Sequence, residues 1–110
     1  MAKKKKITEK SEYERLMGIY QGLPANKLAV AEGLIRQAAR LRVRLDALWA
    51  DLRANGETEQ FSQSAGAKPY ERERPASRAF TSTDKAYQSI IKQLNDLCPD
   101  IREKDDLDDF

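Results

Sequence analysis

The stretch that decides the fold of this 110-residue chain is residues 24–55, which read PANKLAVAEGLIRQAARLRVRLDALWADLRAN. Apolar residues recur there in alternating steps of four and three, at Leu34, Ala38, Leu41, Leu45, Leu48 and Leu52. This spacing is the a/d seam of a coiled coil. Pro24 suits a first helical turn, and Asn55-Gly56 is typical of a helix C-terminus. The pattern predicts one helix over residues 24–55, about 45 Å long at the usual rise per residue.

Two shorter helices are predicted on either side of this one. Ser11-Glu12-Tyr13-Glu14 has the S-x-x-E form of a capping box, and apolar residues follow at helical spacing, which predicts a helix over residues 11–21. An apolar face closed by Pro99 predicts another helix over residues 82–97. We therefore expect an all-α fold, in which the long central helix forms an antiparallel hairpin with the last helix and carries a short N-terminal helix.

The connection over residues 57–80 is polar but contains three aromatic residues, Phe61, Tyr70 and Phe80. Connections longer than about 12–15 residues are uncommon in compact domains and tend to be functional or disordered. We expect an extended segment that reaches towards a neighbouring subunit. Residues 71–74, Glu-Arg-Glu-Arg, alternate in charge and suit ion pairs within or between subunits. The residues expected in an oligomer interface are Leu41, Leu45, Leu48, Trp49, Leu52, Tyr70, Arg72 and Arg74.

The formal net charge of +2 conceals a strong polarity along the chain. Residues 1–10 carry five lysines against Glu9, whereas residues 100–110 carry six acidic residues against two basic ones. Like-charge runs tend to stay unfolded, so we expect a disordered basic arm over 1–10, a helical domain over 11–99 and an acidic tail over 100–110. The tails are either merely solvated or serve as interaction tails, of which a basic arm favours nucleic acid.

The composition argues against an enzyme. The chain has no histidine and one cysteine, which excludes the usual general base, Ser-His or Cys-His nucleophiles, and metal sites built on histidine or clustered cysteine. None of the five glycines lies in a nucleotide-binding fingerprint. We expect no catalytic residues, cofactor or metal site. Residues 28–35 are the longest mostly apolar stretch, too short to span a membrane, which takes about 20 residues, so we expect a soluble, intracellular protein.

The candidate nucleic-acid contacts are basic. Arg36, Arg40 and Arg44 step by four and form one stripe on the central helix, away from the leucine seam. Glu32 can pair with Arg36, but Arg40 and Arg44 have no acid four residues away. Guanidinium groups bind phosphate in a bidentate fork, and the alternative is a solvated helix face. The residues expected to contact DNA are Arg36, Arg40, Arg44, Lys3, Lys4, Lys5 and Lys6.

The order of several short motifs resembles that of the small terminase subunits of tailed bacteriophages, of the short type found in phages and prophages of Gram-positive bacteria. The motifs are Leu23-Pro24-Ala25-Asn26-Lys27, Asn55-Gly56, residues 70–76 (YERERPA) and residues 90–99 (IIKQLNDLCP). The resemblance implies a non-enzymatic protein in the host cytoplasm that forms a homo-oligomeric ring. It also implies binding to viral double-stranded DNA at the packaging site, and recruitment of the large terminase subunit, which holds the ATPase and the nuclease.

One family feature is missing, and two other classes of protein remain open. We find no convincing helix-turn-helix motif, so DNA contact is expected through the arginine stripe or the lysine arm. The same heptads would serve a small dimeric coiled-coil DNA-binding regulator. A helical adaptor without DNA binding is the other alternative, and it would give no salt-dependent affinity for DNA.

Overall fold

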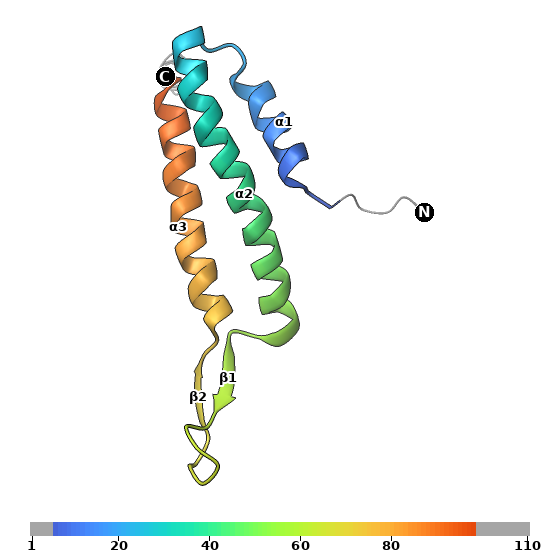
Figure 1. Cartoon of the computed structure of the whole chain (residues 1–110), viewed down its shortest axis with the longest axis vertical. Coiled ribbons are helices and arrows are strands. Elements are labelled where there is room, and N and C mark those ends of the chain that lie inside the picture. The colour runs from blue at the N-terminus through green and yellow to red at the C-terminus, as the bar shows by residue number, and fades with distance from the viewer. Residues whose placement is uncertain (1–5, 99–110) are drawn as a thin grey trace, which may run out of the picture.

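The computed structural model describes residues 6–98 and consists of three helices and a two-stranded hairpin (Figure 1). The elements in chain order are α1 (Glu9–Tyr20), α2 (Ala25–Asn55), β1 (Thr58–Phe61), β2 (Tyr70–Glu73) and α3 (Pro75–Asp96). Helices α2 and α3 lie side by side and run in opposite directions, while α1 packs along the first half of α2. The β-hairpin projects from the far end of the helical pair (Figure 1). The expected helical hairpin with a short N-terminal helix is therefore present.

Helix α1 begins earlier than predicted because its N-cap is Thr8. The Ser11 backbone N–H donates to the Thr8 hydroxyl at 3.1 Å, and the Thr8 N–H donates to the Ser11 hydroxyl at 3.0 Å. Ser11 thus stands at the third helical position instead of capping the helix. The predicted capping box at Ser11 was wrong because Thr8 offers an equivalent hydroxyl one turn earlier, and the helix covers 9–20 instead of 11–21.

Helix α2 follows the prediction within one residue, whereas α3 does not. Gly56 ends α2 with a φ of 83°, which favours glycine, and its N–H donates to the Leu52 carbonyl at 2.8 Å. Helix α3 begins at Pro75, so the predicted start at residue 82 was wrong. Proline fits a first helical position because the N–H that it lacks has no partner there. The first two turns of α3 therefore lie in the segment that was expected to be extended.

The segment between α2 and α3 is a β-hairpin, so the fold is mostly helical but not purely so. Strands β1 and β2 are antiparallel and pair Thr58 with Glu73, Glu59 with Arg72, Gln60 with Glu71, and Phe61 with Tyr70. The Glu59 carboxylate accepts a hydrogen bond from Arg72 Nε at 2.8 Å. The Phe61 and Tyr70 rings meet edge to face, with centroids 5.8 Å apart.

The core lies where α1 covers the helical pair. Its buried members come from all three helices and from the chain just beyond α3: Leu16, Tyr20, Ala31, Ile35, Ala38, Ile90, Leu94 and Cys98. Ile35 and Leu94 are the largest fully buried side chains, although Ile35 lies beside the predicted heptad seam instead of in it. The Tyr20 hydroxyl donates to Asn95 Oδ1 at 3.0 Å, which fastens the end of α1 to α3. Beyond α1 the helical pair has no third helix within the described residues.

Candidate nucleic-acid interface

The arginine stripe of α2 faces the start of α1. Arg40 Nε donates to the Glu9 carboxylate at 3.1 Å. One turn earlier, the Arg36 guanidinium lies over the ring of Tyr13, 4.9 Å from its centroid. Packing of α1 on α2 therefore places the first turn of α1 directly beside the stripe, which joins two regions that are far apart in the sequence.

The ion pairing of the arginine stripe differs in part from the prediction. Arg36 pairs with Glu32 at 2.8 Å, as expected from their spacing, and this hydrogen bond raises the pKa of the Arg36 guanidinium. Arg40 has an acidic partner after all, Glu9, which sequence spacing could not reveal because it lies 31 residues away. Arg44 forms no ion pair or hydrogen bond through its side chain with any other residue in the range 6–98.

A lysine joins the arginines at this position. Lys10 lines a pocket of ≈ 350 Å³ together with Glu9, Tyr13, Arg36 and Ala39. We call Lys10, Arg36, Arg40 and Arg44 the basic cluster. Its two acidic neighbours, Glu9 and Glu32, leave a surplus of positive charge. Lys10 is not among the predicted DNA-binding residues because it precedes the predicted helix over residues 11–21. The available signal is its position between the run of lysines and that helix.

Of the lysine arm, the structure describes Lys6, shortly before the first turn of α1. Lys6 is exposed and lies three residues before Glu9, the first residue of α1, whereas Lys3, Lys4 and Lys5 lie outside the described residues. Because Glu9 contacts Arg40, the first turn of α1 lies next to the arginine stripe. The predicted DNA-binding residues that the structure describes therefore belong to one region of the molecule.

The residues expected in an oligomer interface run from Leu41, in the middle of α2, to the hairpin, and the chain itself already buries some of them. Leu45 and Leu52 are buried between α2 and α3, while Leu41 and Leu48 are half-buried. Trp49 is 51% exposed, although its ring packs against Phe80 with centroids 5.7 Å apart. Of the apolar residues on this half of α2, Trp49 is the one that offers most surface to a neighbour.

The hairpin residues of that predicted interface make contacts within the chain. Tyr70 is exposed. The Arg72 guanidinium lies over the Phe61 ring at 3.5 Å from its centroid and pairs with Glu59. Arg74 donates to Asp51 at 3.0 Å and to the Gly56 carbonyl at 2.7 Å, which fixes the base of the hairpin to the end of α2.

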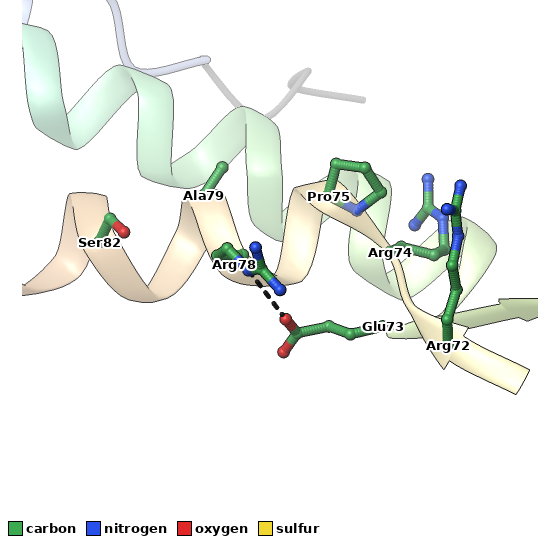
Figure 2. A pocket seen from close by; sticks show the side chains of 7 residues that line it. All are labelled: Arg72, Glu73, Arg74, Pro75, Arg78, Ala79 and Ser82. Carbon is green, nitrogen blue, oxygen red and sulfur yellow. Dashed lines mark ion pairs between the residues drawn. The ribbon is translucent and has the colours of Figure 1, made fainter.

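A second pocket, of ≈ 480 Å³, lies between the hairpin and the first turns of α3 (Figure 2). Its lining includes three arginines, but each has an acidic partner. Arg72 pairs with Glu59 and Arg74 with Asp51. Arg78 pairs with Glu73 at 3.5 Å, as the dashed line in Figure 2 marks. The charges in this pocket are balanced, so it lacks the positive surplus of the basic cluster.

Two further properties concern the described residues. Within residues 6–98, no group of acidic and cysteine side chains is placed to hold a metal ion. None of the helices in this range has the length and apolar character that crossing a membrane demands.

No family model, curated protein or solved structure matches this chain.

Proposed function

We propose that this protein is a self-associating, DNA-binding subunit of the small terminase type, with no enzymatic activity of its own. The observation that carries the proposal is the basic cluster, where the first turn of α1 and the middle of α2 bring Lys10, Arg36, Arg40 and Arg44 together. The resemblance of the sequence motifs to small terminase subunits adds the biological setting. In that setting the ligand is viral double-stranded DNA in the host cytoplasm.

The cluster suits a phosphate backbone in its chemistry and dimensions. Arg36 and Arg44 are eight residues apart, which is about 12 Å along a helix. One strand of B-DNA rises about 3.4 Å per phosphate, so the stripe spans roughly three to four phosphates. Arg44 has no partner for its donors among residues 6–98, and Arg40 can exchange the exposed Glu9 carboxylate for a phosphate because an exposed ion pair is weak. Such contacts read charge and not sequence.

Self-association is supported by the exposed apolar surface on the part of the helical pair nearer the hairpin. Trp49 and Phe80 form an aromatic pair on a part of α2 and α3 that α1 does not cover. Large aromatic residues dominate the energetics of interfaces. We propose that copies of the chain pack side to side here into a ring. The large terminase subunit, the further partner in this proposal, would meet the acidic residues 100–110, which lie outside the described residues.

A salt series of DNA binding tests the proposal. Fluorescence anisotropy with labelled double-stranded DNA should give an affinity that falls steeply with salt. Replacing Arg36, Arg40 and Arg44 by alanine should lower the slope of log affinity against log salt by about 0.9 for each lost phosphate contact. A matched control replaces three exposed basic residues elsewhere, Arg53, Lys85 and Lys92. Equal losses in both variants would contradict a localised site, and no binding by the unaltered protein would favour the helical adaptor.

A further inference from the structure

Among residues 6–98, no further strand pairs with either outer edge of the β-hairpin. The Arg74 N–H donates to the Glu57 carbonyl at 2.8 Å, so residues 57 and 74 form a hydrogen-bonded pair of the ladder. Such pairs alternate along an antiparallel ladder. The backbone groups of Thr58 and Gln60 in β1, and of Glu71 and Glu73 in β2, therefore point outwards. Free strand edges tend to pair with other chains, and a two-stranded hairpin alone is marginally stable.

The side chains of the hairpin divide by strand and by face. Residues directly opposite each other share a face, so Glu59 of β1 lies beside Arg72 of β2. Glu57 and Arg74 follow on the same face. On this face β1 is therefore acidic and β2 basic. The opposite face carries the uncharged Thr58 and Gln60 on β1, and two glutamates on β2.

This distribution of charge decides which edges are compatible. If β2 paired antiparallel with β2 of a second copy, residues with outward backbone groups would have to oppose each other. Glutamate would then face glutamate and arginine would face arginine, which is destabilising. If β1 paired with β1 so that Thr58 opposed Thr58 or Gln60 of the second copy, Glu59 would oppose Glu57 or Glu59 of that copy. Both symmetric pairings thus bring like charges together in these registers.

The remaining antiparallel arrangement, β1 with β2 of a second copy, brings opposite charges together. Its outward groups match when Thr58 opposes Glu73 and Gln60 opposes Glu71, which is the register already present inside the hairpin. Glu59 then meets Arg72 of the second copy, and Phe61 meets Tyr70. We propose that strand β1 of one copy pairs antiparallel with strand β2 of the next, which extends the hairpin into a continuous sheet across subunits.

The charge of the hairpin favours this occupant over nucleic acid. Residues 57–74 contain four glutamates against three basic residues, so the hairpin does not attract a phosphate backbone. The basic cluster lies on the middle of α2, at residues 36–44, whereas the hairpin projects from the end of the helical pair (Figure 1), so both surfaces can be occupied at once. Pairing β1 to β2 is head-to-tail, which generates a ring when the rotation closes. The inference rests on the self-association in the proposed function.

Disulfide trapping tests the pairing directly. In a Cys98→Ala background, Gln60→Cys and Glu71→Cys are introduced into separate chains that carry different tags, and the two chains are co-expressed. Each chain then has one cysteine, so any disulfide joins two copies. Directly opposed residues have Cα atoms about 5.5 Å apart, within the range of a disulfide. On oxidation, the yield of disulfide-linked dimers that join the two different variants should be well above the yield of dimers that join two copies of the same variant.

Charge reversal provides a second measurement. Glu59→Arg alone and Arg72→Glu alone both place like charges across the β1–β2 contact, within and between chains. Mixing the two variants leaves the repulsion inside each chain but restores attraction between copies. The mass of each single variant in light scattering should fall, and the mass of the mixture should return to that of the unaltered protein.

The outcomes separate this inference from the function on which it rests. The strand pairing is overturned if the protein forms its full oligomer but gives no mixed disulfide. It is also overturned if the mixture of charge-reversal variants has no higher mass than each single variant. Both outcomes leave the proposed function standing. Mixed disulfides in a protein that shows no affinity for DNA overturn the proposed function and leave the pairing. A strict monomer overturns both the strand pairing and the proposed ring.

Discussion

The Arg74 guanidinium donates to both carboxylate oxygens of Asp51, at 3.0 and 3.2 Å, and so ties the start of α3 to the last turns of α2. Asp51 also accepts a hydrogen bond from the Asn55 side chain at 2.6 Å. The hydrogen bonds from Asn55 and then from Arg74 lower the pKa of the Asp51 carboxyl below its ordinary value. The base of the hairpin is therefore held by a carboxylate that the folded chain keeps ionised.

The contact between Arg74 and Asp51 makes the stability of the fold depend on pH. A carboxyl whose pKa is lower in the folded state stabilises the fold above its unfolded pKa, and this stabilisation is lost as the pH falls through the folded pKa. We expect Asp51→Asn to flatten that part of the profile when melting temperature is followed from pH 7 down to pH 3. Glu14→Gln, at an exposed position, is the control. A profile for Asp51→Asn as steep as that of the unaltered chain would show that other groups cause the acid dependence.

Removing the centre of the core should be costly. Ile35 is fully buried among residues of all three helices. We expect Ile35→Ala to lower the free energy of unfolding by about 2–5 kcal/mol and Ile35→Val by about 0.5–1.5 kcal/mol. Denaturant titration measures both values. The exposed neighbour Gln37→Ala should stay within about 0.5 kcal/mol of the unaltered chain, and an equal loss there would place the core elsewhere.

Ile35 also illustrates what the sequence can and cannot predict. Helix α2 and its pairing with α3 follow from a long apolar repeat with clear end signals, because such a pattern has few other ways to bury its seam. The strict seam nevertheless missed Ile35, since α1 packs beside the seam and widens the buried face. Likewise, the partner of Arg40 comes from α1, and only tertiary packing brings Glu9 to it. The alternation at residues 71–74 indicated ion pairs, but the strand itself has too few apolar residues to be recognised.

The attachment of α1 should depend on one hydrogen bond. The Tyr20 hydroxyl donates to Asn95 Oδ1 at 3.0 Å, and Tyr20 is buried. We expect Tyr20→Phe to cost about 0.5–1.5 kcal/mol, the net worth of such a bond. Because the bond joins α1 to α3, hydrogen exchange should quicken in residues 9–20 more than in α2. Tyr70→Phe, at an exposed position, is the matched control, and uniform quickening in all three helices would argue against a local role.

The single tryptophan reports directly on self-association. Trp49 is 51% exposed in the isolated chain. Its fluorescence emission maximum should therefore shift to shorter wavelength as the protein concentration rises and a neighbouring copy covers the ring. The mass from light scattering should rise over the same concentrations. Trp49→Lys should shift the association to higher concentration because it places a charge in the contact. An emission maximum that stays constant while the mass rises would place the interface away from Trp49.

The acid beside the arginine stripe should weaken DNA binding. Glu9 lies 3.1 Å from Arg40 and competes with phosphate for its guanidinium. Exposed charges a few ångströms apart interact by about 1 kcal/mol in water, so we expect Glu9→Gln to tighten DNA binding roughly two- to fivefold at low salt. Arg40→Ala should change the DNA affinity in the opposite direction, because it removes a phosphate contact. Glu57→Gln removes the same charge near the hairpin and should leave the affinity unchanged.

Glu9 also favours the first turn of α1, so a thermal melt checks that the helix remains docked. If both glutamine variants tighten binding equally, the gain reflects net charge alone and the phosphate site is not at the basic cluster.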